Sequence, residues 1–457
     1  MKIIIVGLGQ TGNLMLSSLA GDNIDVVVID KDRFLVNEAT DLYNVNGIVG
    51  SGASRETLLQ AGADTADAII ALTRIDEVNL LSCMQAKALG TRFAAARILM
   101  PDFVNEAESL KKEYNIDMLM KPRLHVAEEI YRNIGMPGFT KLEGFWGDKI
   151  QLLDMNVLDN SILKGHTLMD IRQKLKMDML VITVIRKGKL YIPKGDFVIE
   201  SGDSINVAIS RKNLNETLEQ MGIKRNRAKK IVIVGGSNTC KYLIDMLEHD
   251  KCNITILESD AAKCRRLIQQ YPNVNVEYSF GDTLESMEEE NVAAADVLIS
   301  LTDNDETNLV TSMYAWSCHI PSIITRVDKP EHVKLLYKVN IDITVSPAES
   351  TAQRALRFLR DIEVRDAGKD IGKYYLLADS KAEIMEFPAN EDFKALNIAF
   401  KERAFQLKKN IQITAILRGE EIIIPSGVTS INVGDRVIVT SSRENGVRSL
   451  NDILAHK

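Results

Sequence analysis

The residues in this sequence best suited to bind a charged ligand are three glycines near its start and one aspartate. Gly7, Gly9 and Gly12 follow the β-branched run 3–6 and precede a helix-length segment, and Asp30 ends the next β-branched run. This G-x-G-x-x-G spacing between a strand and a helix is typical of a dinucleotide-binding crevice. Gly7 would allow the tight turn, Gly9 the approach of a pyrophosphate, and Gly12 the packing of helix on strand.

The helix after this motif would offer free N–H groups and a partial positive charge to phosphates. Asp30 would accept hydrogen bonds from the adenosine ribose and repel a 2′-phosphate, so NAD(H) is favoured over NADP(H). The neighbouring Lys31 and Arg33 weaken that preference. We expect the cofactor to contact the glycine loop and the ends of later strands, through Gly7, Leu8, Gly9, Gln10, Thr11, Gly12, Asp30, Ser51, Thr73 and Arg97.

Several of these later residues have a second interpretation. Thr73, which follows a predicted strand, would either cap the next helix together with Asp76 or line the nicotinamide end of the crevice. The loop 50–54 would either lie against the adenine or form a plain turn in which Ser54 caps a helix. Arg97 would either reach a phosphate or pair with a neighbouring carboxylate.

The whole pattern occurs twice, at an offset of 228 to 229 residues in the first half of each repeat. In the second copy Gly235, Ser237 and Cys240 align with the three glycines, and Glu258 aligns with Asp30. The side chains of Ser237 and Cys240 would crowd a pyrophosphate. The second copy has therefore either lost its ligand or binds another nucleotide, ATP or ADP, through Gly235, Ser237, Glu258 and Thr302.

Each copy divides into two lobes by its sequence pattern. Short β-branched runs alternate with amphipathic segments in the first part, which is typical of a doubly wound parallel sheet with crossover helices. Close-set strands with a turn at Lys187-Gly188 follow, which indicates a small α+β lobe. We thus expect an α/β protein with two tandem Rossmann-like lobes, each followed by a small α+β lobe, over residues 1–136, 140–222, 229–362 and 370–457.

Short segments between these lobes are expected to act as hinges. Gly135, Pro137 and Gly138 separate the first two lobes, and the basic segment 223–230 separates the two copies. A polar, basic segment of this kind has little reason to be buried, so we expect an exposed linker.

Composition excludes several classes of protein. The net charge of −7 over 457 residues argues against a nucleic-acid partner. Five cysteines without a C-x-x-C pair, and six scattered histidines, suggest neither a disulfide framework nor a metal site. No apolar run approaches the ~20 residues of a membrane span, so a cytosolic protein is expected. No acid–base pair, G-x-S-x-G elbow or P-loop is visible, so we predict no catalytic residues.

The order of the lobes, the motif 3–12 with Asp30, and the two elements 73–79 and 302–308 resemble the regulator-of-potassium-conductance (RCK) domains. Within them, the sequence looks like the TrkA family of peripheral subunits of Trk-type potassium uptake systems, over essentially the whole chain. The resemblance implies that Gly7, Gly9, Gly12, Asp30, Ser51 and Thr73 form an NAD(H) pocket. It also implies a homotetramer built on a ring of Rossmann lobes under a membrane channel.

From the resemblance and the hinges we expect a cytoplasmic, nucleotide-sensing regulatory subunit and not an enzyme. It would bind NAD(H), and ATP or ADP in the second lobe, and gate a Trk-type membrane potassium channel subunit. It would lie at the inner face of the cell membrane through that partner. The alternative is an NAD-dependent oxidoreductase with its substrate between the lobes, which steady turnover of NADH would reveal.

Overall fold

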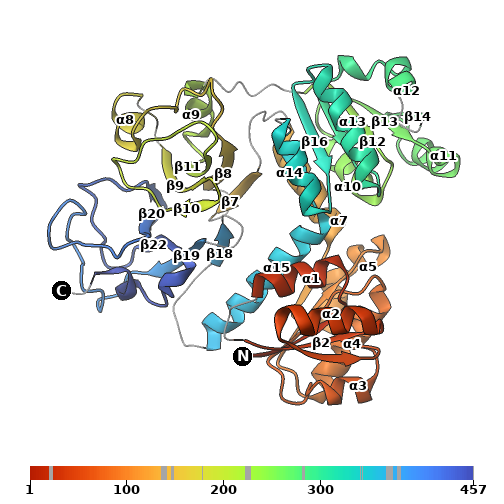
Figure 1. Cartoon of the computed structure of the whole chain (residues 1–457), viewed down its shortest axis with the longest axis horizontal. Coiled ribbons are helices and arrows are strands. Elements are labelled where there is room, and N and C mark those ends of the chain that lie inside the picture. Colours follow the sequence, from red (N-terminus) through yellow and green to blue (C-terminus); the bar gives the residue numbers. More distant parts are fainter. Residues whose placement is uncertain are drawn as a thin grey trace.

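The computed structural model describes most of the chain in four lobes (Figure 1). Two lobes are built on parallel sheets and two on antiparallel sheets, in alternating order, which confirms the predicted fold class. The proposed hinge at 135–138 and most of the linker 223–230 lie outside the described residues, so the exact lobe boundaries stay predictions. The described residues are 1–19, 24–134, 141–145, 149–175, 177, 179–221, 228–279, 284–339, 341, 343–366, 374–377 and 382–455.

The first Rossmann lobe holds a six-stranded parallel sheet in the order β3-β2-β1-β4-β5-β6. Its strands β1 to β5 correspond to the five β-branched or small-residue runs of the sequence. The order reverses between β1 and β4, and this switch point is where ligands bind in open α/β sheets. The strands are Lys2–Val6, Asp25–Asp30, Asn46–Val49, Ala68–Ala71, Phe93–Arg97 and Met118–Met120 (β1 to β6). The helices are Gln10–Leu19, Arg33–Tyr43, Arg55–Gln60, Asp76–Leu89, Pro101–Asn105, Ala107–Glu113 and Pro122–Asn133 (α1 to α7).

The second Rossmann lobe repeats this topology in the order β14-β13-β12-β15-β16-β17. Its strands are Lys230–Val234, Asn253–Glu258, Asn275–Tyr278, Val297–Ser300, Ser322–Arg326 and Ile343–Val345 (β12 to β17). Its helices are Asn238–Leu247, Ala261–Gln270, Leu284–Glu289, Asp305–Ser317, Pro330–Lys338 and Pro347–Asp366 (α10 to α15), with a 3₁₀ turn at Val292–Ala294 (η1).

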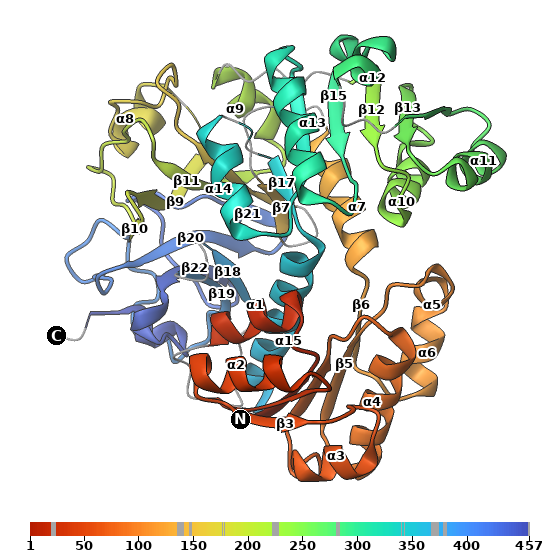
Figure 2. The same ribbon diagram turned by 45° about the vertical axis from the view of Figure 1, so that its right-hand side comes forward.

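The last helix of each Rossmann lobe packs on the other lobe. Helix α15 places an apolar stripe with helical spacing against α1 and the first sheet, and α7 packs against α10 of the second lobe. Figure 2 shows both helices passing between the two lobes. The stripes consist of Ala352, Ala355, Leu356, Leu359 and Ile362 on α15, and of Val126, Ala127 and Ile130 on α7. Each Rossmann core is therefore completed by a helix from the other copy.

The two small lobes are five-stranded sheets that pack against each other through one shared apolar cluster. All strand pairs in them are antiparallel, and the predicted turn is present, with Lys187 and Gly188 both at positive φ. The first has β7 to β11 at Lys141–Phe145, Ile150–Asn156, Met179–Arg186, Lys189–Tyr191 and Ser204–Ser210, with α8 at Leu168–Gln173 and α9 at Leu214–Gln220. The second has β18 to β22 at Tyr374–Leu377, Ala382–Pro388, Ile411–Arg418, Glu421–Ile423 and Arg436–Ser442, with 3₁₀ turns at Arg443–Asn445 (η2) and Leu450–Ile453 (η3).

The second small lobe, in its described residues, has only 3₁₀ turns where the first has α-helices. Thr167 caps α8 by accepting a hydrogen bond from Asp170 N at 3.1 Å. The position aligned with Thr167 is Ala399. Leu168 N donates to the Phe197 carbonyl, and Phe400 N donates to the Thr429 carbonyl in the same way, so the two segments correspond. Ala399 has no side-chain oxygen that could cap a helix, and the aligned segment forms turns.

Each small lobe also contains the same ion pair between a buried aspartate and an arginine. Asp203 is fully buried and accepts hydrogen bonds from Arg186 Nε and Nη2, both at 2.7 Å, and from Glu200 N at 2.9 Å. Asp435 binds Arg418 in the same bidentate way, at 2.9 and 2.8 Å. In the described part of the chain, no helix is long and apolar enough to cross a membrane.

Candidate functional site

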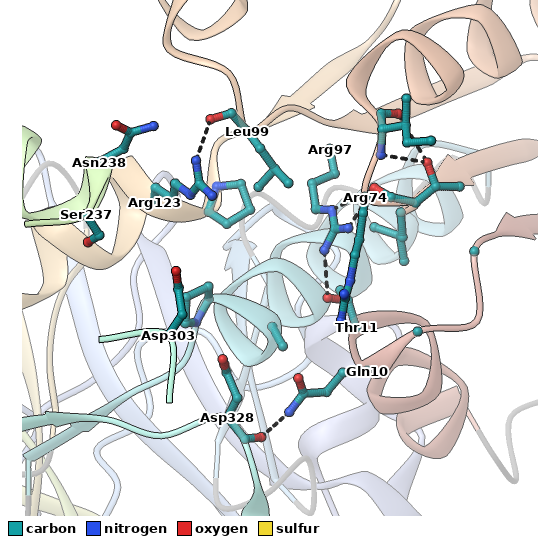
Figure 3. A pocket seen from close by; sticks show the side chains of 18 of the residues that line it. Gln10, Thr11, Arg74, Arg97, Leu99, Arg123, Ser237, Asn238, Asp303 and Asp328 are labelled. Carbon is teal, nitrogen blue, oxygen red and sulfur yellow. Dashed lines mark hydrogen bonds between the residues drawn. The ribbon is translucent and has the colours of Figure 1, made fainter. Parts of the chain in front are cut away.

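One cavity of about 1360 Å³ lies between the two Rossmann lobes. Its wall comes from the switch points of both sheets and from the first residues of α7 and α15, so the two crevices open into the same space (Figure 3). The Gln10 side-chain amide donates to the Asp328 carbonyl across the gap. A single small-molecule site typically occupies about 300–1,000 Å³, so this cavity is large enough for a dinucleotide.

The three glycines of the first copy have different structural roles. Gly7 has φ +98°, and a Cβ there would lie 2.8 Å from Thr73 N. A Cβ on Gly12 would lie 2.2 Å from the Gly7 carbonyl oxygen. By contrast, a Cβ on Gly9 would meet no protein atom within 4 Å. Two glycines are thus needed by the fold itself, whereas Gly9 leaves open the space that a pyrophosphate would fill.

Asp30 is tied to the glycine loop. Its Oδ2 accepts a hydrogen bond from Leu8 N at 2.7 Å, and its Oδ1 accepts one from Asp32 N at 2.9 Å. A carboxylate has about four acceptor positions, so two remain for ribose hydroxyls. Leu8 contributes only its backbone here, since its side chain is fully buried in the core.

Thr73 does not cap α4, and neither does Asp76, so the capping interpretation is wrong for this helix. The Thr73 hydroxyl donates to Asn79 Oδ1 at 2.7 Å, and Asn79 Nδ2 donates to the carbonyls of Thr73 and Arg97, both at 2.9 Å. Asp76 Oδ2 instead accepts from Leu99 N at 2.7 Å. These side chains fasten the ends of β4 and β5 together.

The second copy repeats the asparagine network. Asn308 accepts from the Thr302 hydroxyl at 2.7 Å and donates to the carbonyls of Thr302 and Arg326, both at 3.0 Å. Neither Asn308 nor Asn79 lines the cavity. The network therefore gives the repeated elements 73–79 and 302–308 a structural role.

Arg97 carries a charge that no neighbouring carboxylate neutralises directly. It donates to the Thr73 carbonyl at 3.2 and 2.6 Å and to the Thr11 hydroxyl at 3.3 Å. No described carboxylate lies within ion-pairing distance of it. Burial lowers the pKa of Arg97 to about 10; Asp76 raises this pKa, and the like charges of Arg74 and Arg123 lower it further. A partly buried cation in this condition favours the binding of an anion.

The corresponding cation of the second crevice is neutralised. Asp303 occupies the position of Arg74 and binds Arg326 at 2.5 Å, while Asp328 approaches the same guanidinium at 3.3 Å. The Arg326 guanidinium pulls the pKa of Asp303 below its usual range against the opposing effect of burial. The first crevice is therefore the more attractive to an anionic ligand.

The ribose side of the second crevice is also closed. Glu258 is 5% exposed and accepts from Gly236 N and Asp260 N, both at 2.8 Å. A Cβ on Gly236 would lie 2.6 Å from Leu267 Cδ1. In the first copy Leu8 aligns with Gly236, and Ala39 aligns with Leu267. The large side chain at this place therefore comes from the glycine loop in the first copy and from helix α11 in the second.

The structure brings most, not all, of the predicted site residues to the cavity. Those of the first copy that line it are Gly7, Gly9, Gln10, Thr11, Asp30, Thr73 and Arg97. Gly12 lies beneath Gly7, and Ser51 receives a hydrogen bond from Ala53 N. Ser54 caps α3, as the plain-turn interpretation holds, but Gly50 and Gly52 of that loop do line the cavity. Of the second-copy residues, Ser237 lines the cavity, whereas Gly235, Glu258 and Thr302 are not on its wall.

Two arginines on the cavity wall were missed from the sequence. Arg74 is exposed beside Thr73, and Arg123 is the second residue of α7. Arg74 belongs to the repeated element 73–79, and the aligned residue of the second copy is Asp303. This difference in charge between the copies was the signal that could have identified Arg74. Arg123 had no such signal, because only the folded chain brings the start of α7 to this cavity.

Other chemistry is not supported by the described residues. No group of three or more His, Cys, Asp or Glu residues is arranged to hold a metal ion among them. Burial raises the pKa of the Cys83 and Cys240 thiols, the latter to about 12, so neither is a reactive thiolate.

The repeated sheet order and the glycine-lined switch point define a protein of the tandem Rossmann class. The chain belongs to the TrkA-N domain family, whose model matches residues 3–122 and 231–347. The TrkA-C domain model matches residues 152–222.

Similar proteins cover nearly the full length. The Trk system potassium uptake protein TrkA homolog 1 of Methanosarcina mazei is 28% identical over 450 residues, covering 96% of this chain and 97% of that protein. The Trk system potassium uptake protein TrkA of Haemophilus influenzae is 26% identical over 458 residues, covering 99% and 98%. The GsuK RCK domain structure has a TM-score of 0.63 at 18% identity, covering 97% of this chain and 92% of that one. The NAD-bound GsuK channel has a TM-score of 0.62 at 19% identity, covering 97% and 77%. These structures establish the similarity of fold.

Proposed function

We propose that this chain is a regulatory subunit of potassium transport that binds NAD(H) in its first Rossmann crevice and thereby gates a separate Trk-type membrane transporter. The observation that carries the proposal is the cavity shared by the two lobes, whose wall includes both the open Gly9 and Arg97, a cation without a described ion-pair partner. The names of the full-length relatives support a role in potassium uptake, and the NAD-bound structure of similar fold supports the ligand.

The geometry favours binding over hydride transfer. The described residues that line the cavity include no His, Cys or Tyr. Asp30 and Asp305, two of its carboxylates, are held by backbone N–H groups, and Asp303 is held by an arginine. An oxidoreductase needs a group free to exchange a proton beside the nicotinamide. Bound NAD(H) would supply the redox chemistry of such an enzyme. Here we instead assign NAD(H) the role of a ligand that changes the relative position of the two lobes.

A ligand in this cavity has a mechanical route to the rest of the molecule. Pro122 and Pro347, the first residues of α7 and α15, lie on the cavity wall, and each helix continues onto the opposite lobe. If the lobes adopt two relative positions, a ligand that contacts both walls binds one of them more tightly. The difference between its two binding free energies sets how far the equilibrium shifts. We propose that this movement of the lobes occurs at the inner face of the membrane and changes the conformation of the partner transporter bound there.

For the second crevice, ATP or ADP stays a prediction that the same experiment tests. The purified chain is titrated with NADH, NAD+, ATP and ADP while thermal stability is recorded, and potassium flux is measured with the co-expressed transporter. We expect NADH or NAD+ to stabilise the protein and to change the flux. Stabilisation with unchanged flux would indicate a scaffold instead, and steady consumption of NADH would indicate an enzyme.

The ribose contact gives the first prediction. Asp30→Asn should weaken NAD(H) binding by about 10- to 100-fold, because hydrogen bonds to a charged acceptor contribute about 1.5–3 kcal/mol. Calorimetric titration measures the change. The matched control is Glu258→Gln in the second copy, whose carboxylate is buried and off the cavity wall and should not affect NAD(H) affinity. Equal losses in both variants would contradict assignment of the site to the first crevice.

The proposed homotetramer has a candidate contact surface on α13. Val310, Met313 and Trp316 are 50%, 52% and 46% exposed and lie three residues apart along one side of this helix. Half-exposed tryptophan and methionine are typical of interface centres. Trp316→Asp should therefore convert the assembly to smaller species in light scattering after size exclusion. Leu59→Asp on α3, another half-exposed apolar residue, is the control and should leave the assembly intact.

A further inference from the structure

Helix α1 is held at both ends by the second copy of the repeat. At its N-terminal end, the Gln10 side chain donates a hydrogen bond to the Asp328 carbonyl, which Figure 3 shows across the cavity. At its C-terminal end, the Ser18 carbonyl accepts a hydrogen bond from Arg443 Nη1 at 3.2 Å. Arg443 belongs to η2 of the second small lobe, and none of the described residues of that lobe lines the cavity. The helix therefore joins the cavity to a lobe that lies away from it.

The sequence of α1 explains why its ends favour contacts from elsewhere. None of its ten residues has a charged side chain. The last carbonyls of a helix have no partner within the helix, and they carry the negative end of its dipole. A guanidinium from another lobe is therefore favoured at this end, just as a phosphate is favoured at the other end. An anion in the cavity and Arg443 would act on opposite ends of one dipole.

Helix α1 is also suited to carry a displacement along its length. Ten residues at 1.5 Å each give a helix about 15 Å long. Its buried side chains Met15, Leu16 and Leu19 pack in the same apolar cluster as the stripe of α15. Because packed interiors are dense and transmit strain, a shift at the cavity end of α1 reaches the Ser18 carbonyl.

The segment that carries Arg443 is fastened to its own lobe. Asn445 Nδ2 donates to the carbonyls of Lys409 and Asn410, both at 3.1 Å. Ser442 N donates to the Asn410 carbonyl at 3.0 Å. Asn410 directly precedes β20, and β20 contributes to the apolar cluster that the two small lobes share. A displacement of η2 therefore acts on both small lobes.

We propose that Arg443 couples the occupancy of the first crevice to the second small lobe through α1. Bound NAD(H) holds the N-terminal end of α1, which strengthens the contact between Ser18 and Arg443 and reduces the motion of η2. Arg443 touches no ligand and acts only through the helix. This inference rests on the proposed binding of NAD(H), and it adds a route to the small lobes that is separate from α7 and α15.

Hydrogen exchange followed by mass spectrometry tests the coupling on the full-length chain, at about 0.15 M salt so that distant charges are screened. NADH should slow exchange in the glycine loop, residues 7–12, and also in residues 441–446. In Arg443→Gln, the slowing should persist at 7–12 and disappear at 441–446. Because coupling between two sites is reciprocal, this variant should also bind NADH about fivefold more weakly in calorimetric titration.

The control is Arg448→Gln, which removes an exposed arginine from the same lobe. It should keep both effects of NADH, and it separates loss of the contact from loss of one positive charge. Slowing at 7–12 without slowing at 441–446 in the wild type would overturn the coupling while the proposed function stands. Slowing at both segments in Arg443→Gln would have the same meaning. If NADH neither binds nor slows exchange at either segment, both are overturned.

Discussion

Gly9→Val should abolish NAD(H) binding, by about 100-fold or more, and leave the unfolding of the protein unchanged. The Cβ of the valine would meet no protein atom within 4 Å, so we expect the fold to accommodate the substitution. A pyrophosphate in that space would lose its contacts with the backbone, and two hydrogen bonds to a charged group account for about 3 kcal/mol. Calorimetric titration and urea unfolding measure the two effects.

Gly12→Ala provides the contrast to this result. Its added methyl group would lie 2.2 Å from the Gly7 carbonyl oxygen, so α1 must move away from the strand. Strain of this kind typically costs about 1–3 kcal/mol of unfolding free energy. If Gly9→Val destabilised the protein as much as Gly12→Ala, the space at Gly9 would belong to the fold and not to a ligand.

Asp203→Ala should lower the free energy of unfolding by about 1–3 kcal/mol, because it removes the buried acceptor of the Arg186 and Glu200 N–H groups. Asp203 is fully buried and binds Arg186 through two hydrogen bonds of 2.7 Å. Chemical denaturation followed by circular dichroism measures the change. Because the two small lobes share an apolar cluster, both should become less stable.

The matched control for this prediction is Asp159→Ala in the same lobe. The Asp159 side chain is 87% exposed and binds Lys164 at the surface, where ion pairs are screened by water. Its loss should barely change the unfolding curve. Asp203→Ala unfolding at the same denaturant concentration as Asp159→Ala would contradict the role of the buried pair.

The parallel sheets and the glycine loop were predictable from the sequence because their determinants are local. The β-branched runs give β1 and β2, and the positive φ of Gly7 is one that few other residues adopt. The turn at Lys187-Gly188 was also predictable from local sequence, because its glycine readily adopts the positive φ that the turn requires. Duplication strengthened the prediction of the parallel sheets, since the pattern of β-branched runs was present twice.

The site could be predicted only in part, because its other half depends on long-range packing. Sequence periodicity shows that α15 has an apolar stripe, but not that the stripe lies on the first lobe. Arg123 reaches the cavity as a result of this exchange. The second small lobe has Ala399 where the first has the capping residue Thr167, a difference that a repeat alignment with a drifting offset did not reveal.

The exchange of α7 and α15 has a consequence for how the two copies fold. A protein cut at the middle of the chain would yield two fragments, each with an uncovered apolar groove where the other's helix had been. Neither half would complete its core alone, so the two copies must fold together.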